Sequence, residues 1–314
     1  MPEALTAFAA AKVNLTLAVL GRREDGYHRL SSLVAFADVG DDLALVPGGD
    51  TAVAVEGPQA TALAGDPDNL VVKAARALAE RVPGLMSGRF RLTKRLPVAS
   101  GIGGGSADAA AALRLLARAN GLPLDDPRVT DAAAGTGADV PVCLAGRVCV
   151  MEGIGERLGP ALPCPVLPAV LVNPGVPVET RAVFRALGLS AGETRAVAPT
   201  ALGFEPGVSG ADLVARLRAA GNDLEAPAIA VAPVVADVIG AVRETPGCAL
   251  ARMSGSGATV FGLYGSDAQA GAAAARLAAA HPGWWVAATR LGPAQDCGAT
   301  VRNAPTSAPS TASP

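Results

Sequence analysis

The stretch Leu96-Pro-Val-Ala-Ser-Gly-Ile-Gly-Gly-Gly-Ser-Ala-Asp108 decides the fold of this chain. It sets four glycines within five positions, between a strand-like segment around Phe90 and Leu92 and the Ala-, Leu- and Arg-rich run 107–119, which predicts a helix. Glycines permit positive φ and close backbone approach, so several N–H groups can converge on an anion. The N-terminus of the following helix also favours negative charge. The stretch therefore predicts a phosphate-binding loop.

Glycine-rich loops also occur as tight turns and as close-packing points, so glycines alone do not settle the function. This loop lacks the Gly-Lys-Ser/Thr ending of a P-loop. We also assign no acidic residue to the ribose contact that a Rossmann dinucleotide site requires. A different kind of phosphate cradle is therefore expected.

The pattern from Pro97 to Asp108 resembles the central motif of the GHMP kinases, a family that phosphorylates small alcohols with ATP and without a P-loop. Ile102 stands where that motif more often carries Leu, and it keeps an apolar plug under the loop. The resemblance implies ATP as co-substrate and Mg²⁺ bridging its phosphates, held by phosphate oxygens, water and Ser106. The ATP-binding residues that it implies in the loop are Pro97, Val98, Ala99, Ser100, Gly101, Ile102, Gly103, Gly104, Gly105 and Ser106.

A second motif lies near the N-terminus, where residues 12–19 alternate as in a strand. Lys12, Asn14 and Thr16 fall on one side, which we interpret as the wall of a cleft. The segments Ala11-Lys-Val-Asn-Leu15 and Gly21-Arg-Arg-Glu-Asp-Gly-Tyr-His28 resemble one branch of the GHMP kinases. That branch phosphorylates the 2-hydroxyl of 4-diphosphocytidyl-2-C-methyl-D-erythritol in the non-mevalonate pathway of isoprenoid biosynthesis.

The same resemblance gives roles to three residues of this region. Tyr27 would lie against the cytosine ring and His28 would hydrogen-bond its edge, while Asn14 would contact the substrate. Stacking of a base on an aromatic ring contributes roughly 1–3 kcal/mol. Without the resemblance, a core tyrosine beside a surface histidine would be the simpler interpretation.

The catalytic aspartate is expected in Thr136-Gly-Ala-Asp-Val-Pro141. A single Asp in a turn is usually a structural cap, but the family carries its catalytic aspartate in this pattern. We expect Val140 and Pro141 to hold an extended or turning backbone that fixes Asp139. Asp139 would bind the substrate hydroxyl and accept or orient its proton, and Lys12 would neutralise nearby negative charge.

Two segments complete the predicted ATP and cytidyl sites. Asn69 is a good N-cap for the helix that follows it, and the resemblance places Asn69 and Lys73 beside the adenine. It also places Thr180 and Phe184 along the cytidyl site, although Arg181 stands where that branch often has a proline.

The run from Ala251 to Gly262 resembles the third GHMP motif, with small residues that leave backbone N–H groups room to face substrate phosphates. The residues expected to bind substrate there are Gly255, Ser256 and Gly257. A plain hairpin loop is the alternative.

Bulk composition excludes several other classes of protein. The 314 residues are 50% hydrophobic and carry 26 Lys plus Arg against 28 Asp plus Glu. This nearly balanced net charge does not indicate binding to nucleic acid or to an anionic membrane. The five cysteines are scattered, which argues against a disulfide framework and a zinc site. With no signal peptide or long apolar run in the sequence, we expect a cytoplasmic protein. Both a monomer and a homodimer are compatible with it.

The fold that the resemblance implies is α+β, with two domains and the active site in the cleft between them. Residues 1–160 would form an ATP-binding domain like domain 2 of ribosomal protein S5, residues 161–302 a ferredoxin-like α+β domain, and residues 303–314 a disordered tail. Locally, we predict a strand pair over residues 33–46 that turns at Gly40-Asp-Asp, and a bend or hairpin at Glu152–Glu156.

Three rival functions remain at this point. Mevalonate or homoserine kinases would share the fold, but their substrates need no platform for a nucleobase. A non-catalytic ligand-binding protein would not need Lys12 and Asp139. A dinucleotide-binding protein would need the acidic ribose partner.

Overall fold

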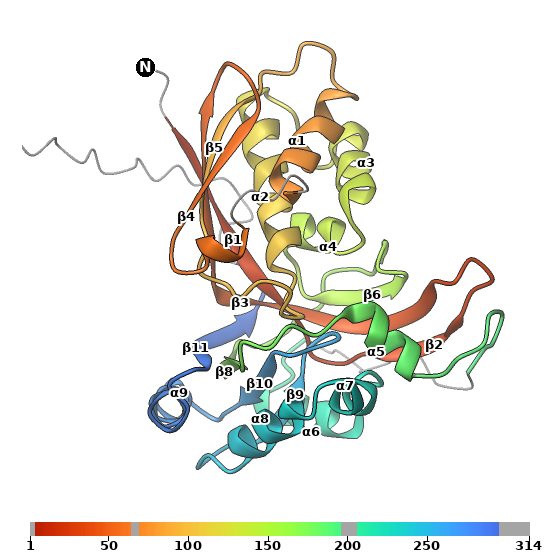
Figure 1. Cartoon of the computed structure of the whole chain (residues 1–314), viewed down its shortest axis with the longest axis vertical. Coiled ribbons are helices and arrows are strands. Elements are labelled where there is room, and N and C mark those ends of the chain that lie inside the picture. The colour runs from red at the N-terminus through yellow and green to blue at the C-terminus, as the bar shows by residue number, and fades with distance from the viewer. Residues whose placement is uncertain (1–3, 64–68, 196–205, 295–314) are drawn as a thin grey trace, which may run out of the picture.

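One long strand, β3 (His28–Pro47), runs through both lobes of the protein, whose computed structural model describes residues 4–63, 69–195 and 206–294 (Figure 1). Its later part pairs with β1 (Leu5–Asn14) and β5 (Gly88–Thr93), and its first part with β2 (Ala18–Arg22) and β6 (Cys149–Gly153), all antiparallel. The predicted tail, residues 303–314, lies outside the described residues.

The predicted strand pair with a turn at Gly40-Asp-Asp is wrong, because the chain continues straight through Gly40 as part of β3. Gly40 faces the backbone of β1, where a Cβ would lie 2.3 Å from the carbonyl oxygen of Ala9. Asp41 is fully buried and accepts hydrogen bonds from Lys94 and from the backbone of Arg95. Glycine and aspartate, which usually mark a turn, here serve the close approach of two paired strands and a buried ion pair.

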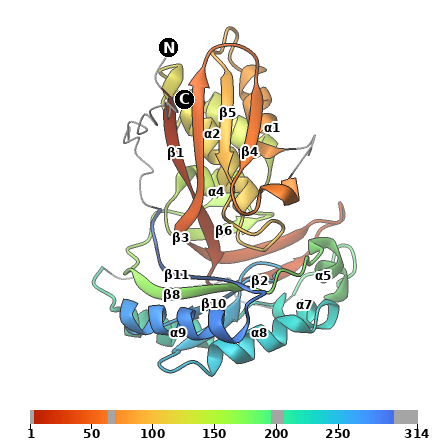
Figure 2. The same cartoon turned by 60° about the vertical axis from the view of Figure 1, so that its left-hand side comes forward.

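The first lobe packs four helices against one face of its strands (Figures 1 and 2). These helices are α1 (Leu70–Ala79), α2 (Gly104–Ala119), α3 (Pro127–Thr136) and α4 (Val140–Ala145), and β4 (Ala52–Glu56) forms the sheet edge beside β5, preceding the short helix η1 (Ala60–Leu63). The core between helices and sheet is rich in alanine on α2, which is buried along most of its length. Small side chains let α2 lie close to β1 and β3, at the centre of the lobe.

The second lobe is a sheet covered by helices on its outer face (Figure 2). The strands run in the order β11 (Trp285–Gly292), β8 (Leu167–Asn173), β10 (Val260–Leu263) and β9 (Leu250–Met253), and β11 joins this sheet to β3. The helices of this lobe are α5 (Thr180–Ala186), α6 (Gly210–Ala219), α7 (Glu225–Val231), α8 (Val234–Arg243) and α9 (Asp267–Ala280). Leu17 and Val19, from the N-terminal part of the chain, also lie in this core. The boundary at residue 160 stays a prediction.

Other local predictions meet mixed outcomes. The hairpin at Glu152–Glu156 is confirmed, because β6 pairs with β7 (Arg157–Leu158) across it. The strand expected over residues 12–19 is instead divided between the end of β1 and the start of β2. Within the described part of the chain, we find no helix long and apolar enough to cross a bilayer.

Candidate active site

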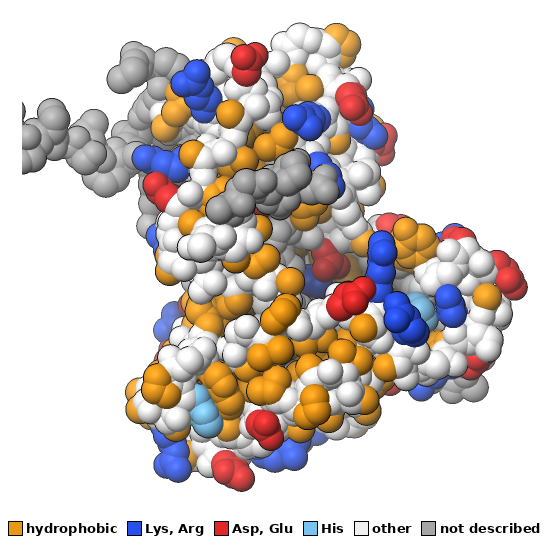
Figure 3. Space-filling model, viewed as in Figure 1, with side chains coloured by type: hydrophobic (Ala, Val, Ile, Leu, Met, Phe, Trp, Pro, Cys, Tyr) orange, Lys and Arg blue, Asp and Glu red, His pale blue; other side chains and the backbone are white. Residues whose placement is uncertain are grey.

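A cleft of about 450 Å³ lies between the two lobes, where the molecule narrows (Figure 3). Its walls come from the end of β1, the glycine loop with the start of α2, the turn before α4, and loops of the second lobe. The predicted site residues that line it are Lys12, Asn14, Ala99, Ser100, Gly101, Gly103, Gly104, Gly105, Ser106, Asp139, Thr180, Phe184, Gly255 and Ser256. Residues 12, 139 and 255, far apart in the sequence, therefore meet at one place.

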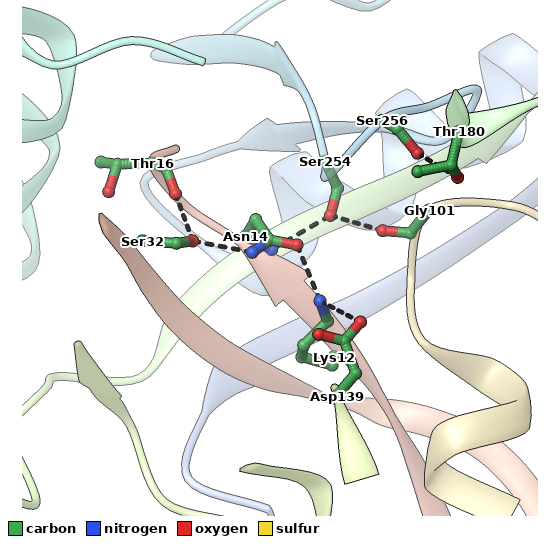
Figure 4. Close-up of polar contacts among 9 residues, drawn as sticks. All are labelled: Lys12, Asn14, Thr16, Ser32, Gly101, Asp139, Thr180, Ser254 and Ser256. Atoms are coloured by element: carbon green, nitrogen blue, oxygen red, sulfur yellow. Dashed lines mark hydrogen bonds and ion pairs between the residues drawn. The ribbon is translucent and has the colours of Figure 1, made fainter. Parts of the chain in front are cut away.

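Lys12 and Asp139 form an ion pair in this cleft (Figure 4). Lys12 Nζ donates to Asp139 Oδ2 at 2.8 Å and to Asn14 Oδ1 at 3.0 Å. The Lys12 side chain is buried, whereas that of Asp139 is 32% exposed. The ammonium group is thus held from two sides, while the carboxylate keeps a face toward the cleft.

Of the extended or turning backbone expected around Asp139, the structure has the turning alternative, which leads directly into a helix. Asp139 itself is the N-cap of α4, with φ −87° and ψ −9°, and Val140 and Pro141 form the first turn of that helix. A proline is tolerated there because the first N–H groups of a helix have no intrahelical partner. Asp139 is therefore fixed by a helix start instead of an extended segment.

Asn14 is completely buried, and both ends of its amide are occupied. Its Oδ1 accepts from Lys12, and its Nδ2 donates to Ser32 Oγ at 2.7 Å. Ser32 Oγ in turn donates to the carbonyl oxygen of Thr16 at 2.6 Å. This network fixes the direction of the Lys12 ammonium, and the side chain of Ser32 is a member that we did not predict.

The glycine loop lies directly against Lys12. Gly103 precedes α2 with φ +63°, and a Cβ on it would lie 3.2 Å from Lys12 Cε. The carbonyl of Ile102 accepts from the backbone N–H of Lys12 at 2.9 Å, and the side chain of Ile102 is completely buried beneath the loop. The expected apolar plug is therefore present, and the loop opens into a helix as predicted.

A second cavity of about 200 Å³ borders the loop on its first-lobe side. Pro97, Val98 and Asn69 line it, and Asn69 also accepts a hydrogen bond from Val71 N at 3.0 Å as the N-cap of α1. Lys73 is exposed on α1 and is not among the described residues that line either cavity.

Beneath this cavity lies a buried group of three charges that sequence reasoning missed. Lys94 Nζ donates to Asp41 Oδ2 at 2.6 Å and to Asp108 Oδ2 at 2.7 Å. Burial raises the pKa of Asp108 to about 7 although Lys94 opposes this. Burial lowers the pKa of Lys94, but the two carboxylates outweigh it and the net shift is upward. The group links β3, the segment directly after β5, and α2.

The predicted cytidyl residues are only partly brought together. The rings of His28 and Phe184 are stacked, with centroids 4.6 Å apart and planes at 25°. Burial lowers the pKa of His28, and the positive charge of Arg22 lowers it further. Tyr27 is 60% exposed, and of these three only Phe184 is among the described residues lining the cleft. The structure thus places His28 on Phe184 and leaves Tyr27 open to solvent.

On the opposite side of the cleft, the second-lobe loop that contains Ser256 contacts α5. Thr180 Oγ1 and Ser256 Oγ lie 2.9 Å apart. Gly257 is not among the described residues lining the cleft, and a Cβ on it would lie 2.7 Å from Met253 Sδ. Arg181, at the second position of α5, is exposed.

Comparison with known proteins identifies the family of this chain. The family model for the GHMP kinases N terminal domain matches residues 69–147, and that for the GHMP kinases C terminal matches residues 209–283. The chain is 60% identical over 287 residues to 4-diphosphocytidyl-2-C-methyl-D-erythritol kinase of Rhodopseudomonas palustris, covering 90% of this chain and 96% of that protein. The enzyme of the same name from Bradyrhizobium diazoefficiens is 57% identical over 285 residues, with 90% and 96% covered.

Solved structures give the same result. A crystal structure of 4-(cytidine 5'-diphospho)-2C-methyl-D-erythritol kinase is similar with a TM-score of 0.72 and 34% identity, covering 92% of this chain and 100% of that one. Homoserine kinase from Cytophaga hutchinsonii, at 19% identity and a TM-score of 0.64 over 93% of this chain and 96% of that one, shares the fold. The predicted two-domain α+β fold is thereby confirmed. This chain belongs to the GHMP kinases, within the family of the 4-diphosphocytidyl-2-C-methyl-D-erythritol kinases.

Proposed function

We propose that this kinase transfers the γ-phosphoryl group of ATP to the 2-hydroxyl of 4-diphosphocytidyl-2-C-methyl-D-erythritol. The products are ADP and the 2-phosphate, and the step belongs to the non-mevalonate pathway of isoprenoid precursor biosynthesis. The observation that carries the proposal is the Lys12–Asp139 pair, 2.8 Å apart in a cleft whose other wall is a glycine loop.

The reaction needs an acceptor for the hydroxyl proton, a cation near the reacting oxygens, and a rigid phosphate cradle. The exposed face of the Asp139 carboxylate would accept or orient the hydroxyl proton. Lys12 would stabilise the negative charge that gathers on the transferred group, and Asn14 holds its ammonium in place. Positioning of this kind accounts for roughly 7–11 kcal/mol of a barrier.

The two cavities divide the ligands between them. The smaller one suits the adenine of ATP, because Pro97 and Val98 offer apolar walls and Asn69 offers a polar edge. Lys73, which is not among the described residues lining either cavity, would have to reach the adenine from the exposed side of α1. The loop from Ala99 to Ser106 would then direct the phosphates into the larger cleft.

The cytidyl end of the substrate would lie toward Phe184, with His28 behind that ring and Tyr27 at the rim. Thr180 and the loop 255–257 would contact the rest of the substrate. The hydroxyl pair of Thr180 and Ser256 supports this arrangement, because it joins the cytidyl side to the third motif.

Mg²⁺ is the expected metal. Among the described residues, no cluster of three His, Cys, Asp or Glu side chains is arranged to hold an ion. Mg²⁺ keeps several waters and binds substrate phosphates in kinase sites, so phosphate oxygens and water would supply most of its ligands. Ser106, on the cleft wall, would supply a hydroxyl ligand, and the ion would neutralise charge on the phosphates.

The test is an ADP-release assay with Mg²⁺ and ATP, in which the cytidyl substrate is compared with mevalonate and homoserine. We expect turnover with the cytidyl substrate alone, and a loss of about 10²–10⁴-fold in kcat for Asp139→Asn. Asp237→Asn, on the exposed side of α8, is the matched control and should retain full activity. Turnover of another alcohol would refute the substrate, and full activity of Asp139→Asn would refute the role of Asp139. The cytoplasmic location and the oligomeric state stay predictions.

A further inference from the structure

The glycine loop of the first lobe and the loop 254–259 of the second lobe are interlocked. The backbone N–H of Thr259 donates to the carbonyl of Ser100 at 3.1 Å. A Cβ on Gly101 would lie 2.7 Å from the carbonyl oxygen of Ser254, and one on Gly255 would lie 2.9 Å from that of Gly101. Neither loop can therefore shift without moving the other.

Ser254 lies at the centre of this contact (Figure 4). Its side chain is completely buried, and its Oγ accepts from the backbone N–H of Asn14 at 3.0 Å. The same Oγ donates to the carbonyl of Gly101 at 3.1 Å. One hydroxyl group thus joins three segments: the end of β1, the glycine loop and the third motif.

The two partners of this hydroxyl belong to opposite sides of the reaction. Gly101 is part of the loop that would hold the ATP phosphates. Asn14 accepts a hydrogen bond from Lys12, which is paired with Asp139. The Ser254 hydroxyl therefore sets the distance between the phosphate cradle and the groups that act on the alcohol. A misplacement of about 1 Å between reacting groups costs on the order of 10²-fold in rate.

We propose that Ser254 is a positioning residue for phosphoryl transfer. Its hydroxyl would touch neither ATP nor the alcohol, because Ser254 is completely buried and is not among the described residues that line the cleft. It holds the end of β1 against the glycine loop, so that the Lys12–Asp139 pair meets the transferred phosphoryl group. This inference rests on the proposed kinase reaction.

The test compares Ser254→Ala with Ser254→Thr, which restores the hydroxyl. We expect kcat to fall by about 10–100-fold in the alanine variant, with the KM for the cytidyl substrate changed by less than about threefold. The threonine variant should recover kcat to within about threefold of wild type. Such a split between kcat and KM separates positioning from a loss of substrate binding.

A matched control separates positioning from simple destabilisation. Thr245 is also buried in the second lobe, where its hydroxyl donates to the carbonyl of Val242, away from the cleft. Thr245→Val should lower the melting temperature while leaving kcat within about twofold of wild type.

Two outcomes would overturn the inference while wild type remains active. One is a kcat for Ser254→Ala within threefold of wild type. The other is a threonine variant that melts within about 2 °C of wild type and yet has a kcat no higher than that of the alanine variant. A shift of about 2 °C corresponds to about 1 kcal/mol, the contribution of one hydrogen bond. If wild type itself does not turn over the cytidyl substrate, the proposed function fails instead.

Discussion

Replacing Gly101 by alanine should separate the glycine loop from the second-lobe loop. Gly101 has φ +76°, a region in which a residue with a side chain costs about 1–2 kcal/mol. Its Cβ would lie 2.6 Å from the carbonyl oxygen of Gly257 and 2.7 Å from that of Ser254. Both are backbone atoms, so the clash adds about 1–3 kcal/mol, as overpacking does elsewhere. We expect a total loss of about 2–5 kcal/mol in the free energy of unfolding.

Gly84→Ala isolates the first of these two costs. Gly84 has φ +75°, but nothing lies within 4 Å of a Cβ built on it. The Gly84→Ala variant should therefore lose only about 1–2 kcal/mol in the free energy of unfolding.

Thermal melting of the two variants, beside the KM for ATP, measures the difference. Gly101→Ala should melt below Gly84→Ala and raise the KM for ATP about tenfold or more, because the loop retreats from its neighbour. Equal melting temperatures with an unchanged KM would refute the interlocking of the loops.

Three further predictions follow from other sites. Asp108 has a folded-state pKa of about 7, above the 3.8 of a free carboxyl, so its contribution to stability is full below about pH 4 and is lost as the pH rises through 7. Asp108→Asn should flatten the melting-temperature profile between about pH 4 and 7, the range between the two pKa values. Asp42→Asn, at an exposed ion pair, should not; an unaltered profile for Asp108→Asn contradicts the shift. Tyr27→Ala should raise the KM for the cytidyl substrate about tenfold without changing the melting temperature, and a wild-type KM would remove Tyr27 from the site. Gly40→Ala should cost about 2–3 kcal/mol through its clash with the paired strand β1. Gly240→Ala, with open space in α8, should stabilise the protein by about 0.5–1 kcal/mol; equal melting temperatures would contradict the close approach of β1 to Gly40.

The glycine loop, its following helix and the N-cap at Asn69 could be predicted from the sequence, because each depends on neighbouring residues. The local rules failed at Gly40, where a turn signal serves the close approach of two paired strands. They decided only partly at Val140 and Pro141, where an extended or turning backbone was expected and a helix begins. At Gly40 the deciding contact comes from β1, a segment remote in the sequence. At Val140 the local preference of a residue before proline for extended backbone gave way to the start of α4.

The candidate site also contains both residues that could be predicted from the sequence and residues that could not. The meeting of Lys12 with Asp139 was expected from the family resemblance, and the structure places them 2.8 Å apart. No pattern of spacing pointed to Lys94 with Asp41 and Asp108, because the three residues come from separate elements and meet only in the packed lobe. The stacking of His28 on Phe184 likewise joins two segments that are far apart in the sequence.

The passage of β3 through both lobes has a consequence for how the protein comes apart. A fragment ending at residue 160 would take Leu17 and Val19 away from the second core, and would take away the part of β3 that pairs with β11. Neither half would then keep a complete hydrophobic interior. The two lobes should therefore denature as one cooperative unit, and separately produced halves should recover a native form only by complementing each other.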